Sequence, residues 1–142
     1  MIFEDKLSEI QTDMISLALE LTEEKIDTAY IYGSYENNSL SFNSFFAQDN
    51  KVYTINKLDQ LGIENLTKDR MFQYLDIGIN DFKRFITLFQ EDKKQAPTQL
   101  KLVYDNVNKK ANAKYSYDFY YSNSDTLTAD NIFEQWYNEV KG

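Results

Sequence analysis

The sequence predicts an α+β fold in which one antiparallel sheet of about five strands has helices packed on one of its faces. Two kinds of hydrophobic periodicity predict this class. In three segments apolar residues recur every three or four positions, as in amphipathic helices, and in five segments they alternate with polar residues, as in strands. The expected order is α-β-β-β-α-β-β-α, and we expect residues 1–142 to form a single domain.

The first helix is expected within residues 2–22. Its apolar side consists of residues three or four positions apart, namely Phe3, Leu7, Ile10, Met14, Leu17 and Leu21. The opposite side carries Glu4, Asp5, Glu9, Asp13 and Glu20. Residues 1–25 contain seven acidic residues and two lysines, so this end of the chain has a net charge of −5. The acidic side fits either a solvated helix surface or an acidic docking surface.

Three strands are expected next, at residues 27–36, 40–48 and 51–55. Each is rich in the aromatic and β-branched residues that sheets favour. Turns rich in Asn and Asp separate them, which indicates a three-stranded meander. Residues 56–66 have no clear pattern, and Gly62 is expected in a loop.

A second helix is expected over residues 67–92, with Thr67 at its start and its end ahead of Pro97. Its apolar side is formed by Met71, Leu75, Ile79, Phe82, Ile86 and Phe89. Gly78 lies within this pattern, where glycine costs about 1 kcal/mol relative to alanine. This glycine marks either a break between two shorter helices or a close approach to the sheet.

A hairpin with one buried and one solvated face is expected from residues 98–104 and 111–121. The apolar row of its second strand contains Ala111, Ala113, Tyr115, Tyr117, Phe119 and Tyr121. Tyr120 interrupts the polar row and should point outward.

A short helix closes the chain, with Thr128 as its expected cap. Its packing side consists of Ile132, Phe133, Trp136 and Val140. We expect Tyr115 and Tyr117 to pack beneath this helix against Phe133 and Trp136.

The composition limits the classes of function. The chain has 15 basic and 23 acidic residues, a net charge of −8, which disfavours nucleic acid and anionic membranes as partners and favours basic proteins. It contains no His and no Cys, so the commonest general base, thiol nucleophiles and the usual transition-metal ligands are missing. The four glycines are isolated, which excludes phosphate-binding loops, and residues 105–110 lack the spacing of a calcium loop. We expect no catalytic residue, no cofactor and no metal.

The N-terminal residues are acidic where a signal peptide is basic, and no apolar run is long enough to span a membrane. We therefore expect a cytoplasmic protein. Two carboxylates on facing strands could still catalyse hydrolysis, because 23 acids make some pair inevitable, but no pair stands out. A small carboxylate-dependent enzyme is thus the less favoured alternative.

The expected site is a protein-binding surface at the end of the hairpin. Tyrosine is common in interfaces because it offers a large contact area with a polar tip at a small entropy cost. The candidate contact residues are Asp105, Asp118, Tyr120, Tyr121 and Asp125. For Tyr120, packing against the last helix is an open alternative, and the acidic side of the first helix is a rival contact surface.

These segments resemble a known family. Pro97–Thr98 begins a strand that ends at Tyr104–Asp105, Tyr115–Tyr117 forms a Tyr-x-Tyr pattern, and Trp136–Tyr137 lies in a terminal helix. This arrangement is similar to the C-terminal half of the YezG-like (EsaG-like) immunity proteins, and the first helix with the tyrosine-rich strand after it is similar to their opening. The middle of the chain agrees only in its helical character.

The resemblance implies an intracellular protein that binds a secreted polymorphic toxin in the producing cell and blocks its C-terminal catalytic domain. For the EsaG-like members that domain is a nuclease, and an acidic inhibitor would be steered to its basic substrate site. The identity of the toxin is not implied, because immunity proteins vary with their toxins. An adaptor or chaperone that keeps a secreted protein ready for export without blocking its activity is the other alternative.

Overall fold

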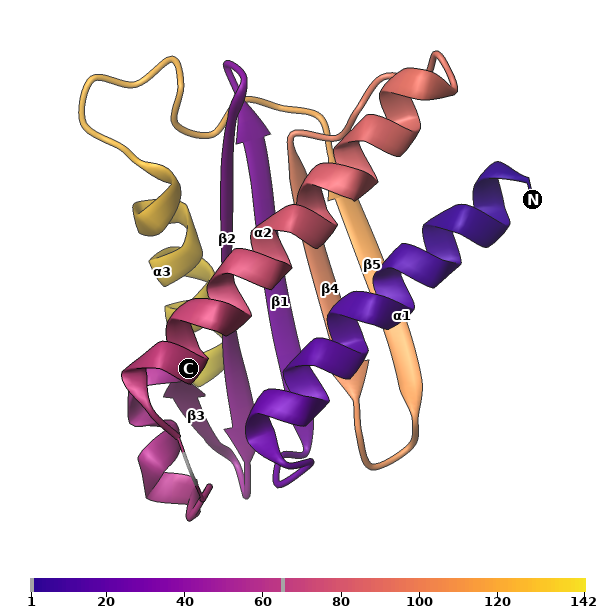
Figure 1. The fold of residues 1–142 in the computed structure, drawn as a ribbon. Coiled ribbons are helices and arrows are strands. Elements are labelled where there is room, and N and C mark those ends of the chain that lie inside the picture. The colour runs from indigo at the N-terminus through magenta and orange to yellow at the C-terminus, as the bar shows by residue number, and fades with distance from the viewer. Residues whose placement is uncertain (1, 65) are drawn as a thin grey trace.

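The computed structural model describes residues 2–64 and 66–142 and confirms the predicted α+β class and order of elements (Figure 1). The elements are α1 (Phe3–Thr22), β1 (Thr28–Glu36), β2 (Ser39–Gln48), β3 (Lys51–Thr54), the 3-10 helix η1 (Ile55–Leu61), α2 (Lys68–Glu91), β4 (Gln99–Asp105), β5 (Lys110–Ser116) and α3 (Ala129–Lys141). Helix η1 begins at Ile55, the last residue of the expected strand 51–55, and continues into the segment 56–66, which has no clear pattern; Gly62 follows the helix. Asn65 of that segment lies outside the described residues.

The five strands among the described residues form one antiparallel sheet in the order β3-β2-β1-β4-β5. β1 lies at its centre and pairs with both β2 and β4. Two-residue turns join β1 to β2 and β2 to β3, and their residues Asn37, Asn38, Asp49 and Asn50 have φ angles between 51° and 65°. Asn and Asp tolerate this left-handed conformation, so the turn residues match the turns that the strands require.

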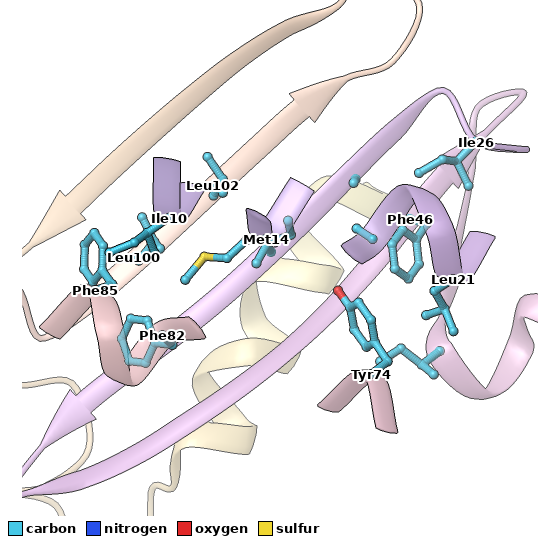
Figure 2. Close-up of a cluster of buried hydrophobic side chains, with 14 of the residues drawn as sticks. Ile10, Met14, Leu21, Ile26, Phe46, Tyr74, Phe82, Phe85, Leu100 and Leu102 are labelled. Carbon is cyan, nitrogen blue, oxygen red and sulfur yellow. The ribbon is translucent and has the colours of Figure 1, made fainter. Parts of the chain in front are cut away.

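Helices α1 and α2 cover one face of the sheet (Figure 1). Their apolar sides and the strands beneath them form the main core. Met14 from α1, Phe82 and Phe85 from α2, and Leu100 and Leu102 from β4 meet there (Figure 2). Each of these side chains is at most 1% exposed, so the hydrophobic burial on this face is nearly complete.

Helix α3 lies on the opposite face of the sheet, so the expectation that helices pack on one face holds for α1 and α2 but not for α3 (Figure 1). Successive residues of a strand point to opposite faces. Ile31 of β1 faces the main core, whereas its neighbours Tyr30 and Tyr32 belong to a second cluster with α3. The ring centroid of Trp136 lies 5.7 Å from that of Tyr30 and 5.1 Å from that of Phe45. Because β1 and β2 are apolar on both faces, a helix is needed on each.

Both predicted helix caps are confirmed. The Thr67 hydroxyl accepts a hydrogen bond from the backbone N–H of Arg70 at 3.1 Å. Thr128 accepts one from the backbone N–H of Asn131 at 3.3 Å, and the Asn131 side chain accepts one from the backbone N–H of Thr128 at 2.9 Å. This reciprocal capping box fixes where α3 begins.

Gly78 marks a close approach to the sheet, and α2 is unbroken at this position. A Cβ atom here would lie 2.1 Å from the ring of Phe42 on β2. Of the two interpretations of this glycine, the close approach is therefore the correct one, because only a residue without a side chain lets the helix pack at this distance.

The end of the hairpin differs from the prediction. Strand β5 ends at Ser116 rather than at residue 121. The Thr98 hydroxyl shares its one proton between the carbonyl oxygens of Asp118 at 2.6 Å and Ser116 at 3.1 Å, and this contact holds the chain where it leaves the sheet. From Tyr117 onward the chain forms a loop, so the alternation of the sequence continues past the end of the strand.

The expected packing of Tyr115 and Tyr117 beneath α3 is wrong. The ring of Tyr115 lies 5.6 Å from that of Phe85 and 6.1 Å from that of Phe89, on the α2 face of the sheet. Tyr117 is 46% exposed. The cause is the topology: α3 packs over β1, β2 and β3, whereas β5 lies at the far edge of the sheet.

Candidate functional site

The loop between β5 and α3, residues 117–128, contains four of the five predicted contact residues and is called here the β5–α3 loop. It also exposes large apolar side chains: Tyr117 is 46% exposed, Phe119 57% and Leu127 37%. Asp118 and Asp125 are exposed in the same loop. Exposed apolar side chains that occur together are typical of interaction surfaces. The β5–α3 loop is therefore the candidate contact surface.

A buried carboxylate fixes the backbone of this loop. Glu36, the last residue of β1, is 2% exposed. Its Oε2 accepts a hydrogen bond from the backbone N–H of Tyr120 at 3.0 Å, and its Oε1 accepts those of Tyr121 at 3.4 Å and Ser122 at 3.0 Å. Burial alone would raise the pKa of Glu36, but hydrogen bonds from Tyr120, Ser122 and Tyr121 outweigh it and hold the pKa below the ordinary value of 4.5.

This carboxylate should make the stability depend on pH. Because the folded-state pKa of Glu36 lies below 4.5, its contribution is fully present above that pH and is lost as the pH falls through the folded-state pKa. Urea titrations from about pH 6 to about pH 3 should therefore show a larger decrease in the free energy of unfolding for the unsubstituted protein than for Glu36→Gln. Equal decreases in both proteins would contradict this role of Glu36.

The two tyrosines of the predicted site are partly buried and hold the loop on the sheet. The Tyr121 hydroxyl and the Ser34 hydroxyl form a hydrogen bond of 2.8 Å, and burial raises the pKa of Tyr121. Tyr120 packs partly against the cluster that Tyr32 forms with α3, so it does not point fully outward as expected. Phe119 follows the exposed Asp118 and precedes the partly buried Tyr120, and it is the most exposed of the loop's large apolar side chains.

A hollow of about 450 Å³ lies between the loop and the start of α3. Glu36 and Tyr121 line it together with Leu127 and Asp130. Asp130 is exposed and belongs to the first turn of α3, so its carboxylate is accessible to a partner. The hollow therefore offers a basic side chain both apolar contact and a carboxylate.

Asp105, the fifth predicted contact residue, is not brought together with the other four. It pairs with Lys110 at the tip of the hairpin, whereas Asp118 follows the other end of β5. Along a strand of this length the two ends are about 20 Å apart. The Asp105 carboxylate accepts hydrogen bonds from Asn108 Nδ2 at 2.8 Å and from the backbone N–H groups of Val107 at 3.0 Å and Asn108 at 3.1 Å. These bonds, the side chain of Asn108 first, lower the pKa of Asp105 and help to shape the turn.

Sequence reasoning missed Glu36 and Phe119. Glu36 has a recognisable signal, since it is an acid at the end of an apolar strand and next to an Asn-Asn turn, but its partners are 84 to 86 positions away in the chain. The tyrosine alternation continues through Phe119 and places it in the buried row of the expected strand. No local pattern indicates that the strand ends at Ser116.

The acidic side of α1, the rival contact surface, is only partly free. Asp13 forms an ion pair with Arg84 of α2 at 3.0 Å, and Arg84 also pairs with Asp81 at 2.9 Å. The hollow of about 530 Å³ between α1 and α2 has both signs of charge, with Lys83 and Arg84 beside Glu9. Asp13 therefore contributes to the packing of the two helices, and this side of α1 lacks the exposed aromatic side chains of the β5–α3 loop, which we take as the better candidate.

A comparison with known proteins finds no family model that matches the chain and no curated protein that is similar to it in sequence. Within residues 2–64 and 66–142, no helix is both long enough and apolar enough to cross a membrane. In the same part of the chain, His, Cys, Asp and Glu side chains do not gather in a group of three or more that could hold a metal ion. The functional assignment therefore depends on the surface described above and on the sequence motifs.

Proposed function

We propose that this protein is a cytoplasmic immunity protein that binds a cognate secreted toxin and neutralises it by stoichiometric inhibition. The observation that carries the proposal is the β5–α3 loop. It combines the exposed ring of Phe119 with the carboxylates of Asp118 and Asp125, and Glu36 fixes its backbone. A surface that is ordered before binding loses little conformational entropy when the partner docks.

The charge of the chain supports a basic target. The net charge of −8 would accelerate the encounter with a basic protein and slow the encounter with nucleic acid. A nuclease is basic where it holds the phosphates of its substrate, so an acidic inhibitor can occupy that place. The motifs at Pro97–Thr98, Tyr104–Asp105 and Tyr115–Tyr117, which resemble those of the YezG-like immunity proteins, point to the same class of target.

The test begins with the partner. Tagged protein is purified from the native cell at low and moderate salt, and the proteins that co-purify are identified by mass spectrometry. We expect one dominant partner with a basic C-terminal domain, recovered at a one-to-one ratio and more weakly at the higher salt concentration. If no specific partner is recovered at either salt concentration, the immunity proposal is wrong. A partner that stays fully active in the complex would instead indicate an adaptor.

Replacing Phe119 with alanine should weaken binding of the partner by about tenfold or more, since exposed aromatic residues commonly become interface hot spots. The free energy of unfolding of the Phe119→Ala variant should change by less than about 0.5 kcal/mol, because most of the ring is exposed to water. Val107→Ala is the matched control, since Val107 is 68% exposed at the opposite tip of the hairpin. Calorimetric titration of each variant with the partner measures the affinity. A larger loss of affinity in Val107→Ala than in Phe119→Ala would place the interface outside the β5–α3 loop.

A further inference from the structure

A second hollow, of about 590 Å³, lies between the first half of α2 and α3 and is called here the α2–α3 groove. Met71, Phe72 and Leu75 of α2 line it together with Phe133 of α3. Phe72 is 62% exposed, so most of a large aromatic surface in the groove is in contact with water. Covering this surface with an apolar partner would be favourable.

The arrangement of these residues suits a helix. Met71 and Leu75 are one turn apart, and Phe72 is adjacent to Met71, so α2 offers an apolar strip along its axis. Phe133 of α3 lines the groove but is only 6% exposed, so Phe72 offers most of the accessible apolar surface. Between the two helices, the groove is lined by Asn43 of β2 and by Thr54, Ile55 and Asn56. A hydrophobic groove on a protein surface is a common receptor for the apolar side of a helix.

The charges at the groove indicate which charge the contacting residues of a partner should carry. Asp130 and Glu134 lie one turn apart on α3 and line the groove, and both are exposed. Neither carboxylate forms an ion pair or a hydrogen bond within residues 2–64 and 66–142. Lys68, at the start of α2, is the basic residue that lines the groove. A partner helix with Lys or Arg on the flank that faces α3 would complement this pattern.

The groove adjoins the proposed contact surface. Asp130 lines both the α2–α3 groove and the hollow beside the β5–α3 loop, so one partner can contact both. A second copy of this chain is a poor occupant. Its exposed helix α1 is acidic on the outer side, with Glu4, Asp5 and Glu9, and would repel Asp130 and Glu134.

We propose that the α2–α3 groove binds an amphipathic helix of the partner protein, with apolar residues on the side that faces Phe72 and basic residues on the flank that faces Glu134. The identity of the partner as a toxin rests on the proposed function. The chemistry of the helix follows from the groove alone.

The probe is a fluorescein-labelled synthetic helix with leucines three and four positions apart and lysines along one flank. A second peptide carries glutamates in place of those lysines. Fluorescence anisotropy should show that the lysine peptide binds the full-length protein more tightly than the glutamate peptide. If neither peptide binds, or both bind equally, the proposal is overturned.

Two variants in the groove and one control outside it locate the binding. Phe72→Ala should weaken binding of the lysine peptide about tenfold. Ile77→Ala changes an exposed apolar residue of α2 outside the groove and should leave that affinity unchanged. Glu134→Lys should weaken binding of the lysine peptide about threefold and strengthen binding of the glutamate peptide by a similar factor. An unchanged preference in Glu134→Lys would overturn the assignment of the basic flank. Circular dichroism confirms that each variant is folded.

The natural partner separates failure of this inference from failure of the proposed function. If Phe72→Ala inhibits the partner as well as the unsubstituted protein does, the groove proposal fails and the immunity function stands. If the lysine peptide binds at Phe72 but the purified partner remains active, the groove proposal stands and the inhibitor function fails. Dimers that sedimentation detects and that Phe72→Ala abolishes would make a second copy the occupant and overturn the proposal.

Discussion

Replacing Gly33 with alanine is expected to lower the free energy of unfolding by about 3 kcal/mol, a large effect for a single methyl group. Gly33 lies in the central strand β1, between Phe42 of β2 and Leu100 of β4. A Cβ atom at this position would lie 2.4 Å from Cδ1 and Cε1 and 2.9 Å from Cγ of Phe82. These distances are shorter than van der Waals contact, so either the ring or the strand must move.

The Phe82 ring has little freedom to move. It is 1% exposed, and it stacks on Phe85 with the ring centroids 5.6 Å apart. The clash includes Cγ, which stays in place when the ring turns about the Cβ–Cγ bond, so a ring flip alone does not remove it. The strain must therefore spread to the backbone of β1 or α2, and both are buried in the main core.

Urea unfolding of Gly33→Ala measures this effect, and Gly62→Ala is the control. Within residues 2–64 and 66–142, no atom beyond the adjacent residues lies within 4 Å of a Cβ atom at Gly62, but its φ angle is +69°, so alanine there should cost only about 1 kcal/mol. In the Gly33→Ala background, Phe82→Leu should cost much less than it does alone, because the smaller side chain relieves the clash. Additive effects of the two changes would contradict the account of this contact.

Glu36→Gln is expected to lower the free energy of unfolding by about 2 kcal/mol and to loosen the β5–α3 loop. Glutamine keeps the size of the side chain but replaces one acceptor oxygen with an NH₂ donor. The new NH₂ group would then face either the backbone N–H of Tyr120 or those of Tyr121 and Ser122, because these two sets meet different carboxylate oxygens. Such a loss of buried acceptors is costly because water cannot replace them fully.

Hydrogen exchange followed by NMR tests this prediction residue by residue. The amides of Tyr120 and Ser122 should exchange faster in Glu36→Gln, whereas amides in the main core should change only by the loss of global stability. Glu20→Gln, a change at an exposed position of α1, is the control and should not alter the exchange of the loop amides or of the core amides. Unchanged exchange at Tyr120 and Ser122 would show that the loop does not depend on Glu36.

The local patterns of the sequence predict most of the fold. Helix periodicity, strand alternation and the Asn-rich turns identify the helices and strands, and the two threonine caps begin α2 and α3. They do not predict which face of the sheet α3 covers, because that depends on how two apolar faces are shared among helices. The signal is present in hindsight: Tyr30 and Tyr32 alternate with Ile31, so β1 is apolar on both sides.

The candidate site is harder to predict because its residues are held by contacts that are distant in sequence. Asp118 and Asp125 are exposed as expected. Tyr121 is held by Ser34, 87 positions away, and Asp105 lies at the other end of the hairpin, where its carboxylate accepts hydrogen bonds within the turn. Local patterns cannot reveal such partners, and the tyrosine alternation hides the end of β5 at Ser116.

The central claim, that this protein is a stoichiometric inhibitor, is tested most directly by titrating the activity of the co-purified partner's catalytic domain. Nuclease activity is the first assay. Activity should decrease linearly with added protein and reach zero at one equivalent, and Phe119→Ala should require a higher concentration for the same inhibition. Undiminished activity at several equivalents, or complete inhibition by a small fraction of one equivalent, would contradict the claim.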